Sequence, residues 1–250
     1  MNTKCNYAVI LYVVYLLSGC ASIQSPGNDN KEIADINTLV NNSMALALRG
    51  ATPQAESMIK QALAMDPEHV NANNIAGLIY AYSNQPRLAT QHFQKALSLA
   101  PNDASTLNNY GNFLCEAGNT DQAEQVFLRA ATNPNNANPE IAYTNAGLCS
   151  VRALDSEKAA NFFVTALDFR EDNAVAYFHL AQINLDKNLA SPALERLRSY
   201  ARFAKHTPQS LKLGIEIARL LKEPEIENDY LIQLQANFPT SEEYTWAISK

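Results

Sequence analysis

Four cysteines carry the most distinctive chemistry in this 250-residue chain, and they are Cys5, Cys20, Cys115 and Cys149. A cysteine acts as a nucleophile when a nearby histidine takes its proton. His179 is the candidate for such a pair with Cys115 or Cys149 across neighbouring helices, although a histidine packed within a helix is the simpler interpretation. Two thiols in an oxidising compartment form a disulfide instead. The compartment therefore decides which chemistry to expect.

The N-terminus predicts export. Lys4 precedes an apolar run of eleven residues, 7–17, which is too short to span a bilayer but suits the hydrophobic region of a signal peptide. The run ends in LSGC at 17–20, which resembles the lipobox of bacterial lipoproteins, where diacylglycerol is attached to the cysteine. An ordinary signal peptide that contains a cysteine is the alternative. We expect residues 1–19 to be removed and Cys20 to carry acyl chains such as palmitate, which hold the protein at a membrane.

The charge of the exported chain argues against a nucleic-acid partner. Lys4 is the only charged residue of 1–19, so removing that segment takes one basic residue from 19 and none from 25 acidic ones, a net charge of −7. Nucleic acid requires a clustered basic face, whereas this balance suits a periplasmic domain. Ala21 follows Cys20, where an aspartate would retain a lipoprotein at the inner membrane in enteric-type sorting. We therefore expect a lipid-anchored protein of the outer membrane whose domain faces the periplasm.

No enzyme signature is found elsewhere in the sequence. There is no glycine-rich phosphate loop, no G-x-S-x-G turn and no H-E-x-x-H pair. The histidines lie far apart, without a metal-ligand partner at local spacing. We therefore expect no catalysis, and no cofactor, metal or small-molecule substrate.

The chain repeats itself every 34 residues, as ALAMDP at 62–67 and ALSLAP at 96–101 show, and this is the length of a tetratricopeptide repeat. In the first five repeats the eighth and twentieth positions are small, and the twenty-fourth is large and apolar. This pattern predicts an all-α tetratricopeptide-repeat (TPR) superhelical solenoid of about six helix-turn-helix repeats over 36–250. Residues 20–35 contain proline and glycine and are expected to form a flexible, lipidated tether in front of it. The repeats are expected to begin near residues 36, 70, 104, 140, 174 and 208.

The sixth repeat departs from the pattern. Ile215 occupies its eighth position, where a small residue is expected, and its second helix is interpreted as degenerate. Terminal repeats of solenoids are atypical because they cover the open end. We expect Tyr244 and Trp246 to pack beyond it as a final cap.

Cys115 and Cys149 fall on the first helices of the third and fourth repeats. Cys5 leaves with the signal peptide and Cys20 receives lipid, so these two remain to pair. A disulfide needs Cα atoms roughly 4.4–6.8 Å apart, which adjacent helices with small neighbouring residues allow. We expect a disulfide that links the two repeats, and two separate buried thiols are the alternative.

A TPR superhelix presents a concave groove that suits a helix or an extended peptide. Repeat geometry places positions two, five, nine, twelve and thirteen of each first helix toward this groove. Asparagine donates and accepts at once, so a row of asparagines can bond a peptide backbone, and a solvated polar face is the alternative. The expected partner-binding residues are Asn74, Leu78, Tyr82, Asn108, Asn112, Glu116, Thr144, Leu148 and Arg152. Asn109 and Asn145 are set aside, because asparagine is common at position six of TPRs generally.

Two stretches resemble the PilF/PilW family of type IV pilus lipoproteins, namely NNYGNFLCEAG at 108–118 and YTNAGLCSVRA at 143–153. LGIEIARLL at 213–221 and LQANFPTSEEY at 234–244 are similar to the family's C-terminal repeat and tail. Leu154-Asp155 departs from the Gly-Asp turn that the family often shows. The resemblance implies a pilotin, an outer-membrane lipoprotein that binds the type IV pilus secretin, promotes its targeting and multimer assembly, and so supports biogenesis of the fimbrium.

Other envelope functions stay open for the same architecture. A TPR lipoprotein could serve outer-membrane protein insertion, or it could act as an adaptor of a periplasmic protease. A receptor for chaperone tails is disfavoured, because a carboxylate clamp needs basic side chains where this chain has Asn74, Asn108 and Val175.

Overall fold

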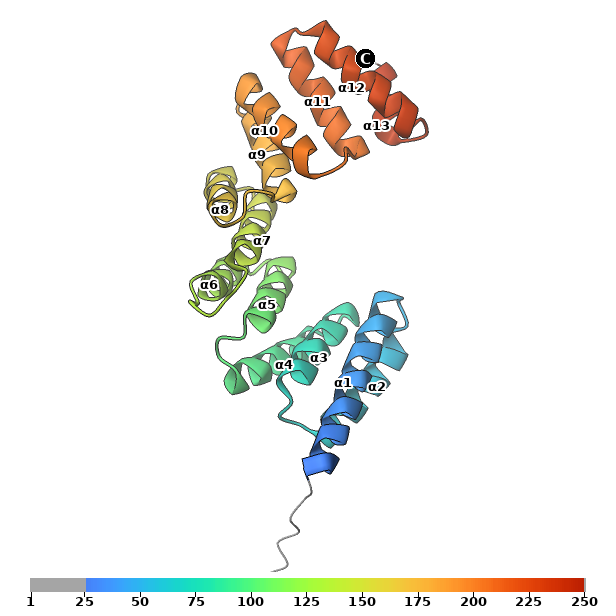
Figure 1. The fold of residues 1–250 in the computed structure, drawn as a ribbon, viewed down its shortest axis with the longest axis vertical. Coiled ribbons are helices and arrows are strands. Elements are labelled where there is room, and N and C mark those ends of the chain that lie inside the picture. Colours follow the sequence, from blue (N-terminus) through green and yellow to red (C-terminus); the bar gives the residue numbers. More distant parts are fainter. Residues whose placement is uncertain (1–25, 250) are drawn as a thin grey trace, which may run out of the picture. The chain divides into compact units, whose positions relative to one another are not determined.

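The computed structural model describes the backbone of residues 26–249 and the side chains of residues 35–249. The expected signal peptide, the lipobox and Cys20 lie outside the described residues. Contacts divide the chain into residues 1–35 and residues 36–250, and the repeats lie in the second unit. All regular structure in the described range is helical (Figure 1). The helices are α1 (Pro26–Leu48), α2 (Thr52–Met65), α3 (Val70–Tyr82), α4 (Pro86–Leu99), α5 (Ala104–Glu116), α6 (Thr120–Ala131), α7 (Pro139–Arg152), α8 (Ser156–Phe169), α9 (Ala174–Asp186), α10 (Ala190–Phe203), α11 (Pro208–Leu221), α12 (Pro224–Asn237) and α13 (Glu242–Ile248).

The start of α1 corrects the predicted tether. The sequence predicts a flexible chain over 20–35, but the helix begins at Pro26, so that prediction is wrong for residues 26–35. Proline suits the first position of a helix, because its fixed φ is helical and its missing N–H would have no intrahelical partner there. Gly27 costs only about 1 kcal/mol relative to alanine in a helix. Pro26 therefore begins α1 instead of preventing it.

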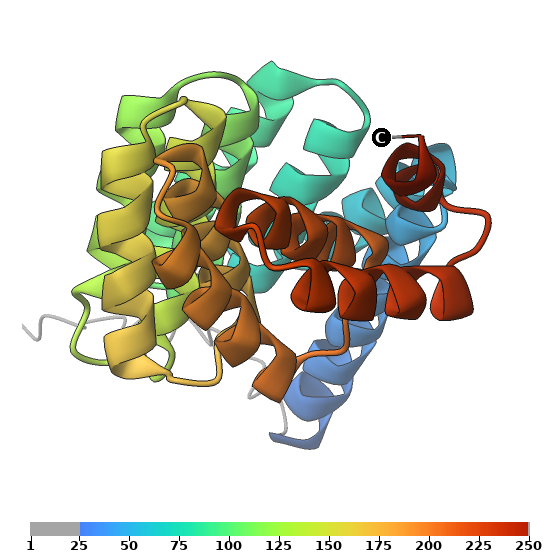
Figure 2. The same ribbon diagram turned by 90° about the horizontal axis from the view of Figure 1, so that it is seen from above.

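The helices pair into consecutive hairpins, which confirms the predicted TPR solenoid. Within the second unit, α3 packs on α4, α5 on α6, α7 on α8, α9 on α10 and α11 on α12. The first helices also form a row, since α3 contacts α5, α5 contacts α7, α7 contacts α9, and α9 contacts α11. Figure 2 shows the green and yellow helices of the third and fourth repeats side by side. This row brings side chains from successive repeats to one surface.

The hairpins of the second, third, fourth and sixth repeats close on a contact between a glycine and an aromatic ring. A Cβ atom added to Gly77 would lie 2.7 Å from the ring of Phe93, which is closer than real Cβ atoms approach. The same relation joins Gly111 to Phe127. The phenylalanines are fully buried. The small eighth residue is therefore needed because the ring of the twenty-fourth residue occupies its side-chain space.

The sixth repeat keeps this contact in a different register. Gly214 packs against Tyr230, and an added Cβ would lie 2.7 Å from the ring. These residues are 16 apart, as are Gly77 and Phe93, so the repeat begins one residue earlier than predicted, at Thr207. The side chain and backbone of Thr207 form a capping box with Ser210 that starts α11. The eighth position of the sixth repeat is therefore small after all, while its second helix stays degenerate in sequence, with Ile226 at the twentieth position where the first five repeats have alanine.

The turn inside each repeat requires a left-handed residue. The φ angle is positive at the fifteenth position of the first five repeats, at Gly50, Asn84, Gly118, Leu154 and Asn188, and at Lys222, the sixteenth residue of the sixth repeat counted from Thr207. Glycine and asparagine accept this conformation readily, whereas Leu154, with φ of 61°, is 91% exposed. The chain thus carries one bulky apolar side chain on a turn where its conformation is unfavourable and its packing contributes little.

The C-terminal helix covers the last repeat. Tyr244 and Trp246 of α13 pack against the cluster that contains Leu213 and Tyr230. Lys212 Nζ lies 4.8 Å from the centroid of the Trp246 ring, a cation–π contact that links α11 to α13. Along the described part of the chain, none of the helices combines the length and apolarity needed to cross a membrane.

Candidate partner-binding groove

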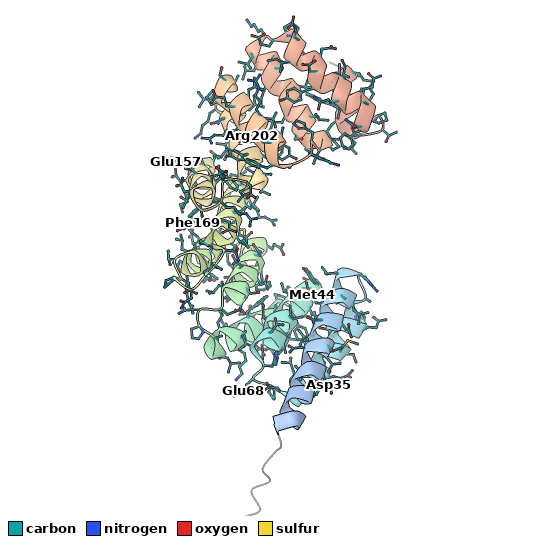
Figure 3. All side chains as sticks on the ribbon, in the orientation of Figure 1. Asp35, Met44, Glu68, Glu157, Phe169 and Arg202 are labelled. Carbon is teal, nitrogen blue, oxygen red and sulfur yellow. A yellow bond between two sulfur atoms is a disulfide. The ribbon has the colours of Figure 1, made fainter. Side chains whose placement is uncertain are left out.

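Side chains from the first helices of four repeats line one hollow of about 410 Å³, which we call the apolar section of the groove. Met44 of α1, labelled in Figure 3, belongs to it, as do Ala81 and Phe113. Six of the nine predicted groove residues lie here, namely Leu78, Tyr82, Asn112, Glu116, Leu148 and Arg152.

Helical spacing explains why these six residues line one hollow. In each of α3, α5 and α7, two of the residues stand four positions apart, as Leu78 and Tyr82 do. Residues at this spacing lie on one face of a helix, one turn apart. Tyr82 is 53% exposed and Leu148 is 36% exposed. Apolar side chains presented side by side at this exposure form a surface that a protein partner can cover.

Two opposite charges flank the apolar section. Glu116 ends α5 and Arg152 ends α7, and both are exposed. Neither side chain forms an ion pair with another described residue. They are therefore available to charged groups of a partner, whose orientation they would help to select.

A second hollow of about 410 Å³ continues the first, and we call it the asparagine section. Asn109, Asn112 and Asn145 line both sections, so the two form one groove. Asn136 and Asn138, from the connector between α6 and α7, line its other side. A third hollow, of about 330 Å³, continues from Asn145 toward α9.

Asn74 does not line the groove, and its predicted role in binding a partner is wrong. The residue is only 2% exposed. Its Oδ1 accepts a hydrogen bond of 3.0 Å from Asn109 Nδ2, and its own Nδ2 donates to Ser105 Oγ at 3.4 Å. The Asn74 carboxamide thus joins α3 to α5 by hydrogen bonds, because position five of one first helix faces position six of the next.

The same inter-repeat pairing engages Asn108. Its Oδ1 accepts from Asn145 Nδ2 at 3.3 Å, and its Nδ2 donates to the carbonyl of Ala104 at 2.9 Å. Asn108 lines the asparagine section, but both ends of its amide already have partners. Asn109 and Asn145, which are not among the predicted groove residues, line the groove instead. The signal in the sequence was the spacing of the asparagines. Asn109 lies 35 residues after Asn74, and Asn145 lies 37 residues after Asn108, so each pair is about one repeat apart.

Thr144 lies in the third hollow and not in the apolar section. Its Oγ1 donates to the carbonyl of Glu140 at 2.6 Å and accepts from Asn173 Nδ2 at 2.7 Å. The hydroxyl therefore connects α7 to Asn173, just before the start of α9, and both of these bonds lie within the chain.

Cys115 and Cys149 form part of the groove wall. Both are buried, their Cα atoms lie 5.8 Å apart, and the structure joins their sulfur atoms between α5 and α7. This separation lies within the range that disulfides adopt. A covalent link at this point holds the third repeat to the fourth across the longer connector.

His179 is not placed as the base of a cysteine nucleophile. The sulfurs of Cys115 and Cys149 are joined to each other, and the His179 ring stacks on Phe163 with 5.2 Å between centroids. Burial lowers the pKa of His179 below its ordinary value. Within the described part of the chain, no group of three or more His, Cys, Asp or Glu side chains is placed to hold a metal ion.

Comparisons with known proteins agree with the repeat fold. Two models of the tetratricopeptide repeat match residues 70–103 and 92–125. Type IV pilus assembly protein PilF of Pseudomonas aeruginosa is 27% identical over 196 residues, which are 78% of this chain and 78% of that protein.

Solved structures of related proteins show the same fold. The structure of P. aeruginosa PilF matches with a TM-score of 0.73 at 24% identity, over 88% of this chain and 100% of that one. The structure of PilW, described as a widely conserved type IV pilus biogenesis factor, matches with a TM-score of 0.73 at 29% identity, over 85% of this chain and 98% of that one. The family resemblance of the sequence is thus confirmed, and the chain is a PilF/PilW-like tetratricopeptide-repeat protein.

Proposed function

We propose that this chain is a pilotin, an outer-membrane lipoprotein that binds the type IV pilus secretin and promotes its targeting and multimer assembly. The observation that carries the proposal is the similarity to PilF, which spans 78% of both chains. PilF is named a type IV pilus assembly protein, and PilW is described as a pilus biogenesis factor. A similar role for this chain makes the secretin its protein partner.

The groove supports a role in binding and not in catalysis. Leu78, Tyr82 and Leu148 offer apolar area beside the charges of Glu116 and Arg152. Complete burial of an exposed large apolar side chain contributes roughly 1.5–3 kcal/mol, so these partly exposed residues together would supply a useful part of the binding free energy. A segment of the secretin with an apolar anchor beside charged groups would match this section.

The proposed lipid anchor would keep the groove at the membrane. Acyl chains on Cys20 contribute about 0.8 kcal/mol for each buried CH₂, and several chains together hold a protein stably. A secretin subunit bound by the TPR domain would be carried to the outer membrane with it. Targeting then follows from the combination of an anchored N-terminus and a binding domain.

Asn112→Arg tests the groove in cells. Asn112 is exposed and lines both sections of the groove, so arginine there should block a partner while costing the fold no more than about 0.5 kcal/mol. We expect detergent-resistant secretin multimers to decline, monomers to accumulate and surface pili to be lost, with the lipoprotein still in the outer membrane. Gln125→Arg on α6 adds the same charge at an exposed position outside the groove and should change none of these.

Two outcomes would contradict the proposal. Normal multimers in the Asn112→Arg strain would exclude this groove as the secretin site. Normal multimers in a strain that lacks the whole chain would exclude the pilotin function. Purification of the lipidated protein from outer membranes with an insertion-machine subunit or a protease, and without secretin, would favour one of the other envelope functions.

A further inference from the structure

We infer that the second helices of the fifth and sixth repeats carry a further interaction surface, which binds an acidic segment of a protein partner with an apolar side chain beside its carboxylates. The surface centres on a hollow of about 720 Å³ between the ends of α10 and α12, which we call the basic hollow. It is lined by residues 201–206 and by Gln233, Asn237 and Phe238. None of these residues belongs to a first helix, so the hollow is separate from the groove and the inference goes beyond the proposed function.

Positive charge is concentrated in one segment of the chain. Residues 187–222, from the turn before α10 to the turn after α11, contain eight lysine or arginine residues and two glutamates, a net charge of +6. The remaining 11 basic and 23 acidic residues give the rest of the chain a net charge of −12. Solubility requires only a net charge, and like charges gathered in one place repel one another. The segregation therefore suits a partner of opposite sign.

Three cations of this segment lie at the basic hollow without a counter-ion. Arg198, Arg202 and Lys205 form no ion pair with another described residue. Arg202, labelled in Figure 3, and Lys205 are exposed and line the hollow itself. Arg198 is exposed and stands four positions before Arg202, so it lies one turn away on the same face of α10. An arginine fork also matches a carboxylate in shape, because two of its N–H groups can donate to the two oxygens.

Helix polarity does not account for these cations. A basic residue in the last turn of a helix stabilises the negative helix end, and Arg202 has this position in α10. The effect is confined to that turn, so it does not explain Arg198, one turn earlier, or Lys205, which follows the helix. Among the described residues, no acidic side chain lines the hollow. The nearest acidic residues of α10 and α12, Glu195 and Asp229, each precede the first lining residue of their helix by at least one turn.

Aromatic rings and carboxamides complete the basic hollow. Phe203 is 37% exposed and stacks on Tyr177 with 6.0 Å between ring centroids, so its position is held while part of its ring stays accessible. Phe238 lines the hollow from the end of α12. Gln233 and Asn237 are exposed and add hydrogen-bonding groups. A segment that places an apolar side chain on the rings and carboxylates on the cations would match all three features.

A protein segment fits this surface better than a lipid layer or a nucleic acid. The headgroups of a bilayer form a broad layer that meets protruding side chains, whereas here rings and carboxamides lie in a hollow between two helices. A nucleic acid would be repelled by the net charge of −12 on the rest of the chain. An acidic protein segment is short enough to meet only the basic region, and its apolar side chain has a place to bind.

The test uses the mature sequence with Cys20→Ala, so that no acyl chain takes part, and three fluorescent peptides of about 12 residues. The first repeats Glu-Glu-Phe, the second Gln-Gln-Phe and the third Glu-Glu-Ser. By fluorescence anisotropy at low salt we expect the first to bind most tightly, and the other two at least about threefold more weakly. The double variant Arg202→Gln, Lys205→Gln should raise the Kd of the first peptide about three- to tenfold, and added salt should weaken the wild type in the same direction.

Arg49→Gln combined with Arg87→Gln is the matched control. Both arginines are exposed, lie in the first two repeats and form no ion pair with a described residue, so this double variant removes the same net charge away from the hollow. Its Kd should equal that of the wild type. Both double variants should melt close to the wild-type temperature, because each change is made at an exposed side chain without an ion pair.

Three outcomes would overturn the inference. Equal loss of affinity in the two double variants would show that net charge decides binding and that the hollow does not. Equal binding of the glutamate and glutamine peptides would show that carboxylates are not recognised. Sedimentation with vesicles of phosphatidylglycerol and phosphatidylethanolamine should leave the unlipidated chain in the supernatant. Pelleting that Arg202→Gln, Lys205→Gln abolishes, without binding of the first peptide, would assign the surface to lipid headgroups instead.

Discussion

Asn145 on α7 donates a hydrogen bond to Asn108 on α5, with 3.3 Å between Nδ2 and Oδ1. Further along the same two helices, Cys115 and Cys149 join them again. The third and fourth repeats are thus linked at two levels, one polar and one covalent, and the groove lies over both. Two links separated along a helix pair restrict rotation more than one does. The relative orientation of α5 and α7, which sets the shape of the groove, is therefore held before a partner binds.

Thiol titration tests the covalent link. A soluble chain that begins after Cys20 contains only Cys115 and Cys149, so we expect no free thiol when it is unfolded without reductant. Closing a loop with a sequence separation of 34 residues contributes roughly 3–4 kcal/mol in the chain-entropy model. Reduction should therefore lower the melting temperature of the chain. Hydrogen exchange should show that the loss of protection is greatest in the third and fourth repeats. Two titratable thiols in the unreduced protein would show that the bond does not form.

Gly111→Ala tests the contact between the two helices of the third repeat. The added Cβ would lie 2.5 Å from the Phe127 ring, which is held in the core. Overpacking of this kind costs about 1–3 kcal/mol, and the higher helix propensity of alanine offsets up to about 1 kcal/mol. We expect the free energy of unfolding in urea to fall by about 1–2 kcal/mol. Replacing Phe127 by leucine in the same chain should recover part of the loss, and an unchanged urea midpoint for Gly111→Ala would contradict this account.

The repeat pattern predicts most of the fold because a few contacts recur at fixed spacing. A small residue and a large one 16 positions later determine where each hairpin closes, and these are visible in the sequence as Gly77 and Phe93. The pattern fails in the sixth repeat, where Gly214 stands next to Ile215 and a shift of one residue exchanges them. Only the packing of Gly214 on Tyr230 identifies the register. It fails also at Pro26, where a residue typical of linkers begins a helix.

The groove was less predictable than the hairpins. Periodicity places residues on a helix face, and this is sufficient for Leu78 and Tyr82. It does not say whether a polar side chain points to solvent or bonds to the next repeat, and Asn74 and Asn109 differ in this respect. That choice depends on how two helices cross, which involves residues a full repeat apart.

Leu154→Gly should stabilise the chain. Leu154 has φ of 61° and is 91% exposed, so leucine is strained there and loses little packing on removal. The left-handed conformation costs roughly 1–2 kcal/mol for a residue with a Cβ, and glycine removes this cost. The greater freedom of glycine in the unfolded chain offsets part of the gain. We expect a net gain of about 0.5–1 kcal/mol by thermal melting. Leu154→Asn should gain less, and a lower melting temperature for glycine would show that Leu154 has a packing role.

Cys20→Ala tests the anchor. If Cys20 carries the lipid, the variant should lose it and appear in the soluble periplasmic fraction or as an uncleaved precursor. Metabolic labelling with palmitate and membrane fractionation measure both effects. Ser18→Thr, which keeps a small residue before the cysteine, should leave lipidation intact. Wild-type fractionation of Cys20→Ala with the outer membrane would contradict the lipobox.

Three partly buried histidines make the stability of the fold depend on pH. Burial lowers the pKa of His92, His179 and His206 below their ordinary value of 6.5. The unfolded chain, with pKa near the ordinary value, therefore binds more protons than the folded chain as the pH falls below about 6.5. The free energy of unfolding should be greatest above that pH. It should then decrease as the pH falls through the lowered values of the folded state.

His179→Gln tests the histidine whose ring packs against two phenylalanines. The His179 ring stacks on Phe163 and meets Phe178 edge-on, with centroids 5.2 and 5.3 Å away. Glutamine loses the ring packing, so the variant should be less stable than the wild type at all pH values. Because glutamine does not titrate, the melting temperature of the variant should fall less between about pH 7.5 and pH 5.5 than that of the wild type. Thermal melts followed by circular dichroism at both pH values measure this difference. Parallel pH curves for the two proteins would show that protonation of His179 does not oppose folding.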